Sequence, residues 1–357
     1  MNEKISIQPS AGEILTEAML LPGKVYWVTE DASLRALLAK ALGISATINT
    51  GQDVNIPFVY PWGERYSKKD RITGSVHPDH TRHIRHDSAR PTDPRIVLKG
   101  TGLLANKYDP QPGSPQRWHV DDEGIFGLED KERYMRGLCD ISEAVRDRNF
   151  ALFGNSYGGR FGIPLAILAY QELPFTDQRG NVLFGDIDTL RRVGLIPKQE
   201  YELVGPETPY SHRDRDFTQA VCYGRALLSN ERLDISDTDP SVRDFASFFV
   251  WLVKAQTTNV AVLHGLELSN DEFNSSNMTL GGESVDLSAC HPLEGSNEIV
   301  RRDKDDLIRA LSEVQITMQQ VPVMSFEDVV HDTYQSTLKK VREARASDVA
   351  KRIEDAE

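Results

Sequence analysis

The chain has 357 residues and a formal net charge of −13, with apolar and charged fractions of 39% and 27%. This length allows one large domain or two lobes with a sizeable core. The acidic balance argues against a general nucleic-acid binder, because phosphate contacts need a basic surface. The apolar runs are shorter than the ~20 residues that cross a bilayer, and the N-terminus shows no signal-peptide pattern. We therefore expect a cytoplasmic protein that binds neither nucleic acid nor membranes.

The three cysteines are widely separated and show no CxxC spacing; they are Cys139, Cys222 and Cys290. Neither a disulfide framework nor a cysteine zinc site is indicated. We expect these side chains to fill the core.

The first predicted unit covers residues 24–44, where a short alternating strand leads into an amphipathic helix. Asp31 or Ser33 would begin this helix, since both are good N-caps. Residues 50–94 are polar and show little periodicity, so we interpret them as extended loops. Residues 94–102, "PRIVLKGTG", predict a strand that ends at Lys99 and is followed by a Gly-x-Gly turn.

Helical spacing over residues 128–148, with acids in the first turn and arginines in the last, predicts a helix. Apolar segments predict further strands, the second of which could also be a short helix; they cover residues 149–154, 164–175 and 220–229.

The back half changes to helical spacing, over residues 240–265, 305–320 and 326–357. A mixed front half joined to a helical back half predicts an α+β fold with a two-lobed plan. We place the α+β region, with its phosphate contacts, at residues 1–232. The helical lobe, with a metal-binding loop, takes residues 233–357.

Two local patterns point to other chemistry. Gly154-Asn155-Ser156-Tyr157-Gly158 fits the nucleophile elbow of α/β-hydrolases, which would make Ser156 a nucleophile. The alternating strands and helices that should follow are missing from the pattern, so a glycine-rich turn is favoured. The histidines of 77–86 recur every third residue and could bind a metal on a helix, but prolines favour a loop or a positive patch there.

Transfer from a nucleotide needs cations that hold the phosphates and ligands that hold a metal ion. Lys99 ends a predicted strand, and an acidic helix follows it. Asn277 and Asp286 lie nine positions apart around Gly281-Gly282, and both offer the hard oxygen ligands that Mg²⁺ prefers.

These residues resemble the selenoprotein O (SelO) family, protein adenylyltransferases with a protein-kinase-like fold. The family has a His-Gly segment, then Asp-Asn-Met, then an Asp nine positions after that Asn. Here His264-Gly265, Asn277-Met278 and Asp286 match in the same order.

Further segments are similar to the family in the same order along the chain. "RALLSNER" is similar to its "RVAxSxxR" strand, whose arginines hold the nucleotide phosphates, and "LKGTG" to its "LKGAG". "FGIP" and the last helix also resemble the family. The resemblance implies that Lys99, Arg225 and Arg232 contact the phosphates of ATP, and that Asn277 and Asp286 bind Mg²⁺ or Mn²⁺.

The chain departs from the family at the catalytic loop, where Ser276 stands in place of the Asp that accepts a proton. Asp271 could take this role. The "DYGPF" of the family is "DLSAC" here, and its "GDGRA" segment is missing. The acidic partner of the strand lysine could be Asp140, Glu143 or Glu132, and the similarity of "SEAV" to the family's "SEAM" favours Glu143.

The expected function is therefore an ATP- and Mg²⁺-dependent transferase that moves AMP to a hydroxyl of a protein or peptide substrate. A kinase acting on a peptide or a small molecule is an alternative. The replacement by Ser276 also allows an inactive nucleotide-binding protein, and the elbow pattern allows a hydrolase.

Overall fold

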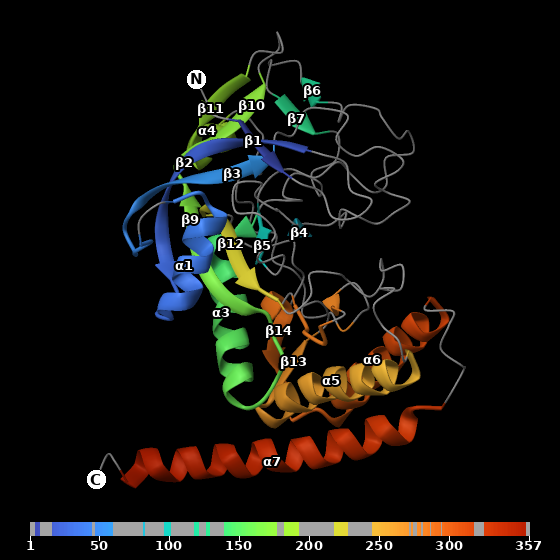
Figure 1. Ribbon diagram of the computed structural model, residues 1–357. Coiled ribbons are helices and arrows are strands. Elements are labelled where there is room, and N and C mark those ends of the chain that lie inside the picture. Colours follow the sequence, from blue (N-terminus) through green and yellow to red (C-terminus); the bar gives the residue numbers. More distant parts are fainter. Residues whose placement is uncertain are drawn as a thin grey trace. The chain divides into compact units, whose positions relative to one another are not determined.

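The computed structural model of the chain describes residues 4–7, 16–44, 47–59, 81–82, 96–100, 118–120, 126–128, 139–176, 182–192, 218–227, 245–270, 273, 277–279, 281–285, 287–293, 295–317 and 325–354. These residues form a mixed α+β structure with an antiparallel sheet and several helices, as the sequence predicts (Figure 1). The chain divides into two compact units. Unit 1 comprises residues 1–145 and 164–226, and unit 2 comprises residues 146–163 and 227–357.

Unit 1 is built on an eight-stranded sheet with the order β1-β2-β9-β12-β5-β4, in which β3 also pairs with β2 and β8 with β12. Its strands are β1 (Lys4–Ile7), β2 (Thr16–Val28), β3 (Asp53–Val59), β4 (Thr81–Arg82), β5 (Ile96–Lys99), β8 (Cys139–Asp140), β9 (Ile163–Tyr170) and β12 (Ala220–Ala226). Two small hairpins are β6 (Trp118–Val120) with β7 (Phe126–Leu128), and β10 (Leu173–Thr176) with β11 (Val182–Gly185). A short helix, α4 (Ile187–Arg192), follows β11.

Helix α1 (Ala32–Ala41) begins where the sequence predicts. Asp31 is the N-cap, and its Oδ1 accepts hydrogen bonds from the backbone N–H groups of Ser33 at 2.8 Å and Leu34 at 3.1 Å. The hydroxyl of Ser33 also donates to Oδ1 and contributes most to lowering the pKa of the Asp31 carboxyl, and the two backbone bonds lower this pKa further. Leu38 of α1 packs in the same buried cluster as Leu98 of β5 and Cys222 of β12. Helix α1 therefore covers one face of the sheet.

Helix α3 (Ile141–Ser156) differs from the predicted helix over residues 128–148. Cys139–Asp140 is a strand that pairs with β12, and the helix starts only after it. Residues 149–154, predicted as a strand, belong to this helix. The buried Ala144 clusters with Ile167 and Val221, so the first turn of α3 covers the other face of the sheet.

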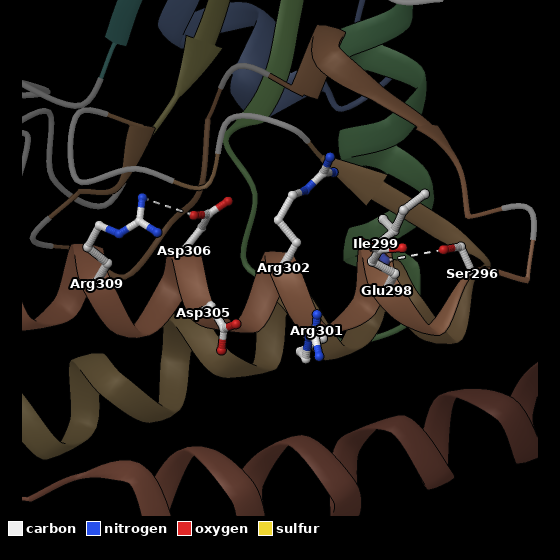
Figure 2. Close-up of a pocket in the computed structure, with 8 residues that line it drawn as sticks. All are labelled: Ser296, Glu298, Ile299, Arg301, Arg302, Asp305, Asp306 and Arg309. Atoms are coloured by element: carbon white, nitrogen blue, oxygen red, sulfur yellow. Dashed lines mark hydrogen bonds and ion pairs between the residues drawn. The ribbon is translucent and has the colours of Figure 1, made fainter. Parts of the chain in front are cut away.

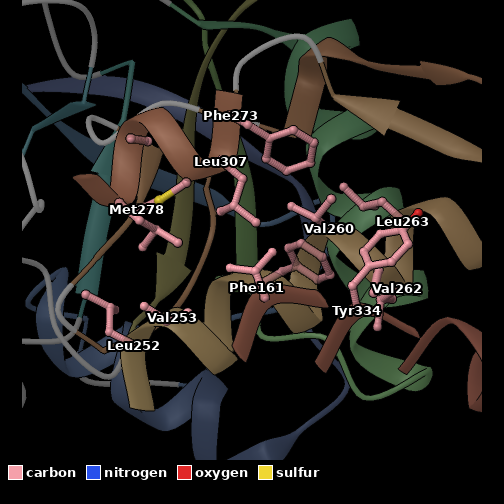
Figure 3. Close-up of a cluster of buried hydrophobic side chains, with 14 of the residues drawn as sticks. Phe161, Leu252, Val253, Val260, Val262, Leu263, Phe273, Met278, Leu307 and Tyr334 are labelled. Carbon is pink, nitrogen blue, oxygen red and sulfur yellow. The ribbon is translucent and has the colours of Figure 1, made fainter. Parts of the chain in front are cut away.

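Unit 2 is mainly helical, with α5 (Phe245–Gly265), α6 (Asn297–Thr317) and α7 (Glu327–Glu354). All three were predicted, although α6 begins earlier than its apolar spacing suggests. Two short strands lie between α5 and α6 in the sequence: β13 (Leu268–Asn270) pairs with β14 (Cys290–Pro292). The short 3₁₀ helix η5 (Leu287–Ala289) immediately precedes β14. The core of the unit joins side chains from α5, α6 and α7 with Phe161 and Met278 (Figure 3).

The three cysteines are buried and unbridged, which confirms the prediction that they fill the core. Burial raises the pKa of the Cys222 thiol and of the Tyr170 phenol well above their usual values, so both remain neutral near pH 7. Among the described helices, none combines the length and the apolar character that a bilayer span requires.

Candidate functional site

Lys99 and Glu143 form an ion pair inside unit 1. Lys99 ends β5, and its Nζ lies 2.5 Å from Oε1 of Glu143 in the first turn of α3. The lysine side chain is 1% exposed and the glutamate side chain 20% exposed. A lysine is rarely buried this deeply without a carboxylate, because desolvation disfavours the charged form. This ion pair therefore links the end of β5 to the first turn of α3.

Only one of the three acids proposed as the lysine's partner makes this contact within the described residues. Asp140 is the N-cap of α3: its carboxylate accepts from the backbone N–H of Ser142 at 2.8 Å and from the N–H groups of Thr218 at 2.8 Å and Gln219 at 3.1 Å. Asp140 thus ties the start of α3 to the start of β12. Glu132 lies outside the described residues.

Arg225 lies on the same face of the sheet as Lys99. In the β12–β5 pairing, Tyr223 is opposite Lys99 and Arg225 is opposite Val97. Residues two apart on a strand share a face, so Lys99 and Arg225 are diagonal neighbours. Arg225 is fully buried, and its Cζ lies 6.0 Å from the centroid of the Tyr223 ring. Arg232, the second predicted arginine, lies outside the described residues.

Gly100 shows why a glycine follows the lysine. Its φ is +85°, and a Cβ there would lie 2.3 Å from the carbonyl oxygen of Val221. A larger residue would be strained and would push β5 away from β12. The turn after Lys99 therefore requires glycine.

In unit 2, residues 277–279 and 281–285 form a tight hairpin. Met278 pairs antiparallel with Ser284, the N–H of Val285 donates to the carbonyl of Asn277 at 2.9 Å, and the N–H of Gly282 donates to that of Thr279 at 2.9 Å. Asn277 is buried and lies opposite Val285, the residue that precedes Asp286 in the sequence. Gly282 turns the chain with φ +79°, the role expected of this glycine pair.

Two buried polar residues of α5 hold the tip of the hairpin. Nε2 of Gln256 donates to the carbonyl of Glu283 at 3.2 Å, and Nδ2 of Asn259 donates to the carbonyl of Gly282 at 3.2 Å and to Oγ of Ser284 at 2.9 Å. Oδ1 of Asn259 accepts from the N–H of Arg160 at 2.7 Å. Sequence analysis missed this pair, although two amides three positions apart in a mainly apolar helical stretch are an available signal.

Helix α3 contacts the segment that follows Asp286. The carboxylate of Asp147, which is 3% exposed, accepts from the backbone N–H of Leu287 at 3.1 Å. Nη2 of Arg146 donates to the carbonyl of Cys290 at 2.8 Å. Sequence analysis missed both residues. The sequence shows that Asp147 follows Glu143 by four positions, but the partner of Asp147, the N–H of Leu287, is distant in the chain.

Of the two residues proposed as Mg²⁺ ligands, only Asn277 lies within the described residues. Asn277 supplies an amide oxygen at a buried position, and Asp286 is the next residue after the partner of Asn277 in the hairpin. Within the described ranges, no group of three or more His, Cys, Asp or Glu could hold a metal. Asp286, Asp271 and Ser276 lie outside those ranges, as do the histidines of 77–86.

Ser156 does not lie in the surroundings that a nucleophile elbow needs. It is the last residue of α3, where the elbow requires a preceding strand. Its Oγ is exposed and donates to the carbonyl of Phe153 at 2.7 Å, a local bond at the end of a helix. The glycine-rich turn is therefore the better description of this segment.

His264 takes part in a buried network in unit 2. Its Nδ1 lies 2.7 Å from the hydroxyl of Tyr334, and its Nε2 lies 3.0 Å from Oδ2 of Asp303. Oγ of Ser269 donates to the same carboxylate oxygen at 2.5 Å. Burial raises the pKa of Tyr334 to about 12. The network joins the end of α5 to α6 and α7, which indicates a role in packing.

A separate surface pocket of about 390 Å³ runs along α6. Figure 2 shows its side chains on two sides of the helix, with Arg302, Asp306 and Arg309 on one side and Arg301 and Asp305 on the other. Its three arginines are matched by three acids, and Arg309 pairs with Asp306 at 3.3 Å. This balance of charge gives no preference for a phosphate.

The described site residues therefore occur in two clusters, each within its own unit. Lys99, Glu143 and Arg225 form the cluster of unit 1, and residues 277–279 and 281–285 form the hairpin of unit 2. Searches against protein-family models and against curated protein sequences find no match to the chain.

Proposed function

We propose that the chain is an ATP- and Mg²⁺-dependent transferase with a kinase-like two-lobed arrangement, in which units 1 and 2 are the lobes. The reaction that we propose moves AMP from ATP to a hydroxyl of a protein or peptide: the hydroxyl oxygen bonds to the α-phosphorus, and pyrophosphate leaves. The observation that carries the proposal is the ion pair between Lys99 of β5 and Glu143 of α3. A buried lysine oriented by a helix glutamate is the arrangement with which kinase-like enzymes hold nucleotide phosphates.

The second support is the position of Arg225 beside Lys99 on one face of the sheet. Two buried cations on neighbouring strands favour an anionic ligand, and the triphosphate of ATP supplies such charge. In the proposal, Lys99 and Arg225 contact phosphate oxygens, Arg232 adds a third cation, and Glu143 orients the lysine.

The hairpin of residues 277–285 would bring the metal ligands together. Asn277 and Asp286 would hold Mg²⁺, which neutralises phosphate charge when bound. Asp271 is the residue that we propose as proton acceptor for the attacking hydroxyl, because Ser276 is too weak a base.

The test uses the full chain, Mg²⁺ and ATP labelled at either the α or the γ phosphorus, with a mixture of proteins as substrate. Label from the α position in protein, lost in Lys99→Met and Asp286→Ala, is the expected result. Label from the γ position alone would assign a kinase. The variant Ser156→Ala is the matched control and should keep full activity.

A catalytically silent nucleotide-binding protein gives a different pattern. ATP would bind to the wild-type chain, and Asp286→Ala would lose the metal-dependent part of binding, yet neither label would appear in any product. If the wild-type chain binds no ATP at any Mg²⁺ concentration, the proposed function is wrong.

A further inference from the structure

Three exposed apolar side chains lie close to Tyr157 in unit 2. Leu152 and Phe153 belong to the end of α3 and are 46% and 43% exposed, and Val349 of α7 is 51% exposed. The rings of Phe153 and Tyr157 meet edge to face at 5.3 Å. The Tyr157 hydroxyl donates to Oδ2 of Asp348 at 2.7 Å, and Val349 is the next residue of α7. Single exposed apolar residues are common, whereas a group of them marks a surface that binds another molecule.

Two side-chain contacts fix this part of α7 to the rest of unit 2. One is the hydrogen bond between Tyr157 and Asp348, which comes from the end of α3. The other joins Nη2 of Arg345 to Oε2 of Glu267, just after α5, at 2.8 Å. Every residue from 342 to 352 except Arg345 is exposed. The surface is therefore held in one arrangement, and a ligand would not have to order it on binding.

The end of α7 is basic, although the whole chain is acidic. Residues 339–354 contain six Lys or Arg and three Asp or Glu, whereas the chain has a net charge of −13. Arg345, Asp348 and Arg352 follow one another at spacings of three and four, so they lie on one side of the helix. The hydrogen bond to Asp348 raises the pKa of the Tyr157 phenol, and the charges of Arg352 and Arg345 oppose this rise. Both guanidinium groups therefore lie near the Tyr157 ring.

These side chains form one surface with an apolar centre and a basic edge; they are Leu152, Phe153, Tyr157, Val349, Arg345 and Arg352. We propose that this surface binds an acidic amphipathic helix of another protein, one with apolar residues on one face and Asp or Glu beside them. Aromatic residues and arginine are enriched where proteins bind each other. This role is independent of ATP and of the reaction proposed above.

A protein helix fits this surface better than a larger anionic partner does. The net charge of −13 repels anionic bilayers and nucleic acids at long range, and the basic residues are confined to one end of one helix. A single helix is small enough to contact only that region. Because α3 and α7 are helices, a third helix can pack on them with apolar side chains at i, i+3, i+4 and i+7. Its carboxylates would then meet the two arginines.

The experiment measures binding of a fluorescent synthetic peptide to the full chain by fluorescence anisotropy. The peptide has about 18 residues, enough to form a helix, with Leu and Phe on one face and Glu on the other. A second peptide carries Lys in place of Glu. We expect the Glu peptide to bind with an affinity that falls as salt is added. The Lys peptide should bind at least about tenfold more weakly.

Substitutions of exposed residues test the apolar centre. Phe153→Ser and Val349→Ser should each weaken binding of the Glu peptide by about tenfold or more, the usual effect of truncating a central interface residue. Ile316→Ser is the matched control, because Ile316 is an exposed apolar residue of α6 in the same unit. Its affinity should stay within about twofold of wild type. Equal weakening in Ile316→Ser and Phe153→Ser would overturn the proposal, and Val349→Ser decides alone if Phe153→Ser does not fold.

The basic edge is tested by a pair of arginine substitutions. Arg352→Gln should weaken binding of the Glu peptide by about threefold or more and reduce its dependence on salt. Arg301→Gln removes an exposed arginine of α6 and should leave the affinity within about twofold of wild type. Equal losses in the two variants would mean that the peptide responds only to net charge, which contradicts a local basic edge.

Three further outcomes count against the proposal. The first is that neither peptide binds, and the second is that both bind equally, since the charge at the edge is then not recognised. The third uses vesicles of phosphatidylserine and phosphatidylcholine. If the chain binds these vesicles in a way that Phe153→Ser abolishes, and does not bind the Glu peptide, the surface binds membranes and the proposed protein partner is wrong.

Discussion

Nζ of Lys99 lies 2.5 Å from Oε1 of Glu143, and the two partners differ in exposure, with the lysine at 1% and the glutamate at 20%. The difference matters because removing one partner leaves the other in its own surroundings. A lysine that loses this carboxylate stays in the interior, whereas a glutamate that loses the lysine can reach water. The ion pair should therefore respond unequally to the two single substitutions.

The first prediction is that Glu143→Gln destabilises the chain more than Lys99→Met. Glu143→Gln leaves the more deeply buried charge, that of Lys99, without its carboxylate, and breaking a buried ion pair in this way costs about 3–5 kcal/mol. We expect Lys99→Met to cost less than about half of this, because the glutamate that remains is partly exposed to water. Urea unfolding of both variants and of the double variant measures the difference. A loss in Lys99→Met as large as that in Glu143→Gln would contradict the unequal burial.

The second prediction concerns Asp140, whose carboxylate accepts from three backbone N–H groups. Asp140→Ala should lower the free energy of unfolding by at least about 2 kcal/mol, because buried donors lose their acceptor and α3 loses its cap. Ser142→Ala, which removes only one hydroxyl donor to the same carboxylate, is the control and should cost about 1 kcal/mol or less. Comparable losses in the two variants would show that the cap is unimportant.

Local signals explain what could be predicted from the sequence. Asp31 could be named as one of two candidate caps, beside Ser33, because the N–H groups that it binds lie two and three residues away. The start of α3 was misplaced because helical spacing continues through residues 128–148, while the partner that makes Cys139–Asp140 a strand is β12, about 80 residues later. Pairing over such a distance leaves no mark on local periodicity.

In the candidate site too, contacts that the sequence signals could be predicted, and contacts with distant backbone groups could not. Glu143 was chosen as the partner of Lys99 by similarity to a family segment, and the structure places these two residues in contact. Asp147 was overlooked because its partner is a backbone N–H 140 residues away, and a backbone group has no residue type to recognise. Gln256 and Asn259 also bind mainly backbone groups of a distant turn.

The third prediction compares Asn259 and Thr257, two buried polar residues of α5 whose replacement should change stability in different ways. Asn259→Leu should lower the free energy of unfolding by about 3 kcal/mol, since the N–H of Arg160 and the carbonyl of Gly282 lose a buried partner. The Oγ1 of Thr257 is buried and finds no hydrogen-bond partner within the described part of the chain. Thr257→Val should therefore leave stability unchanged or raise it by about 1 kcal/mol.

Urea unfolding of the two α5 variants at one pH gives this comparison directly. The hairpin should also loosen in Asn259→Leu alone, which faster hydrogen exchange at the amide of Val285 would report. A marked loss of stability in Thr257→Val would mean that its hydroxyl has a partner beyond the described residues.

The fourth prediction follows from Tyr334, whose pKa burial raises from 10.0 to about 12. Below pH 10 the phenol is protonated in both states, so its contribution to stability is complete. Between pH 10 and about 12 it ionises in the unfolded chain but stays protonated in the folded chain, and this ionisation lowers the free energy of the unfolded state. Stability should therefore fall over this range of pH.

Tyr334→Phe tests this dependence, because phenylalanine fills the same space without an ionisable group. At pH 7 the variant should lose about 1 kcal/mol, since the hydroxyl lies 2.7 Å from Nδ1 of His264. Above pH 10 the gap between the variant and the wild type should narrow and then reverse in sign. Urea unfolding of both proteins at steps from pH 8 to 11.5 measures it, and parallel curves would show that Tyr334 titrates alike in the folded and unfolded chain.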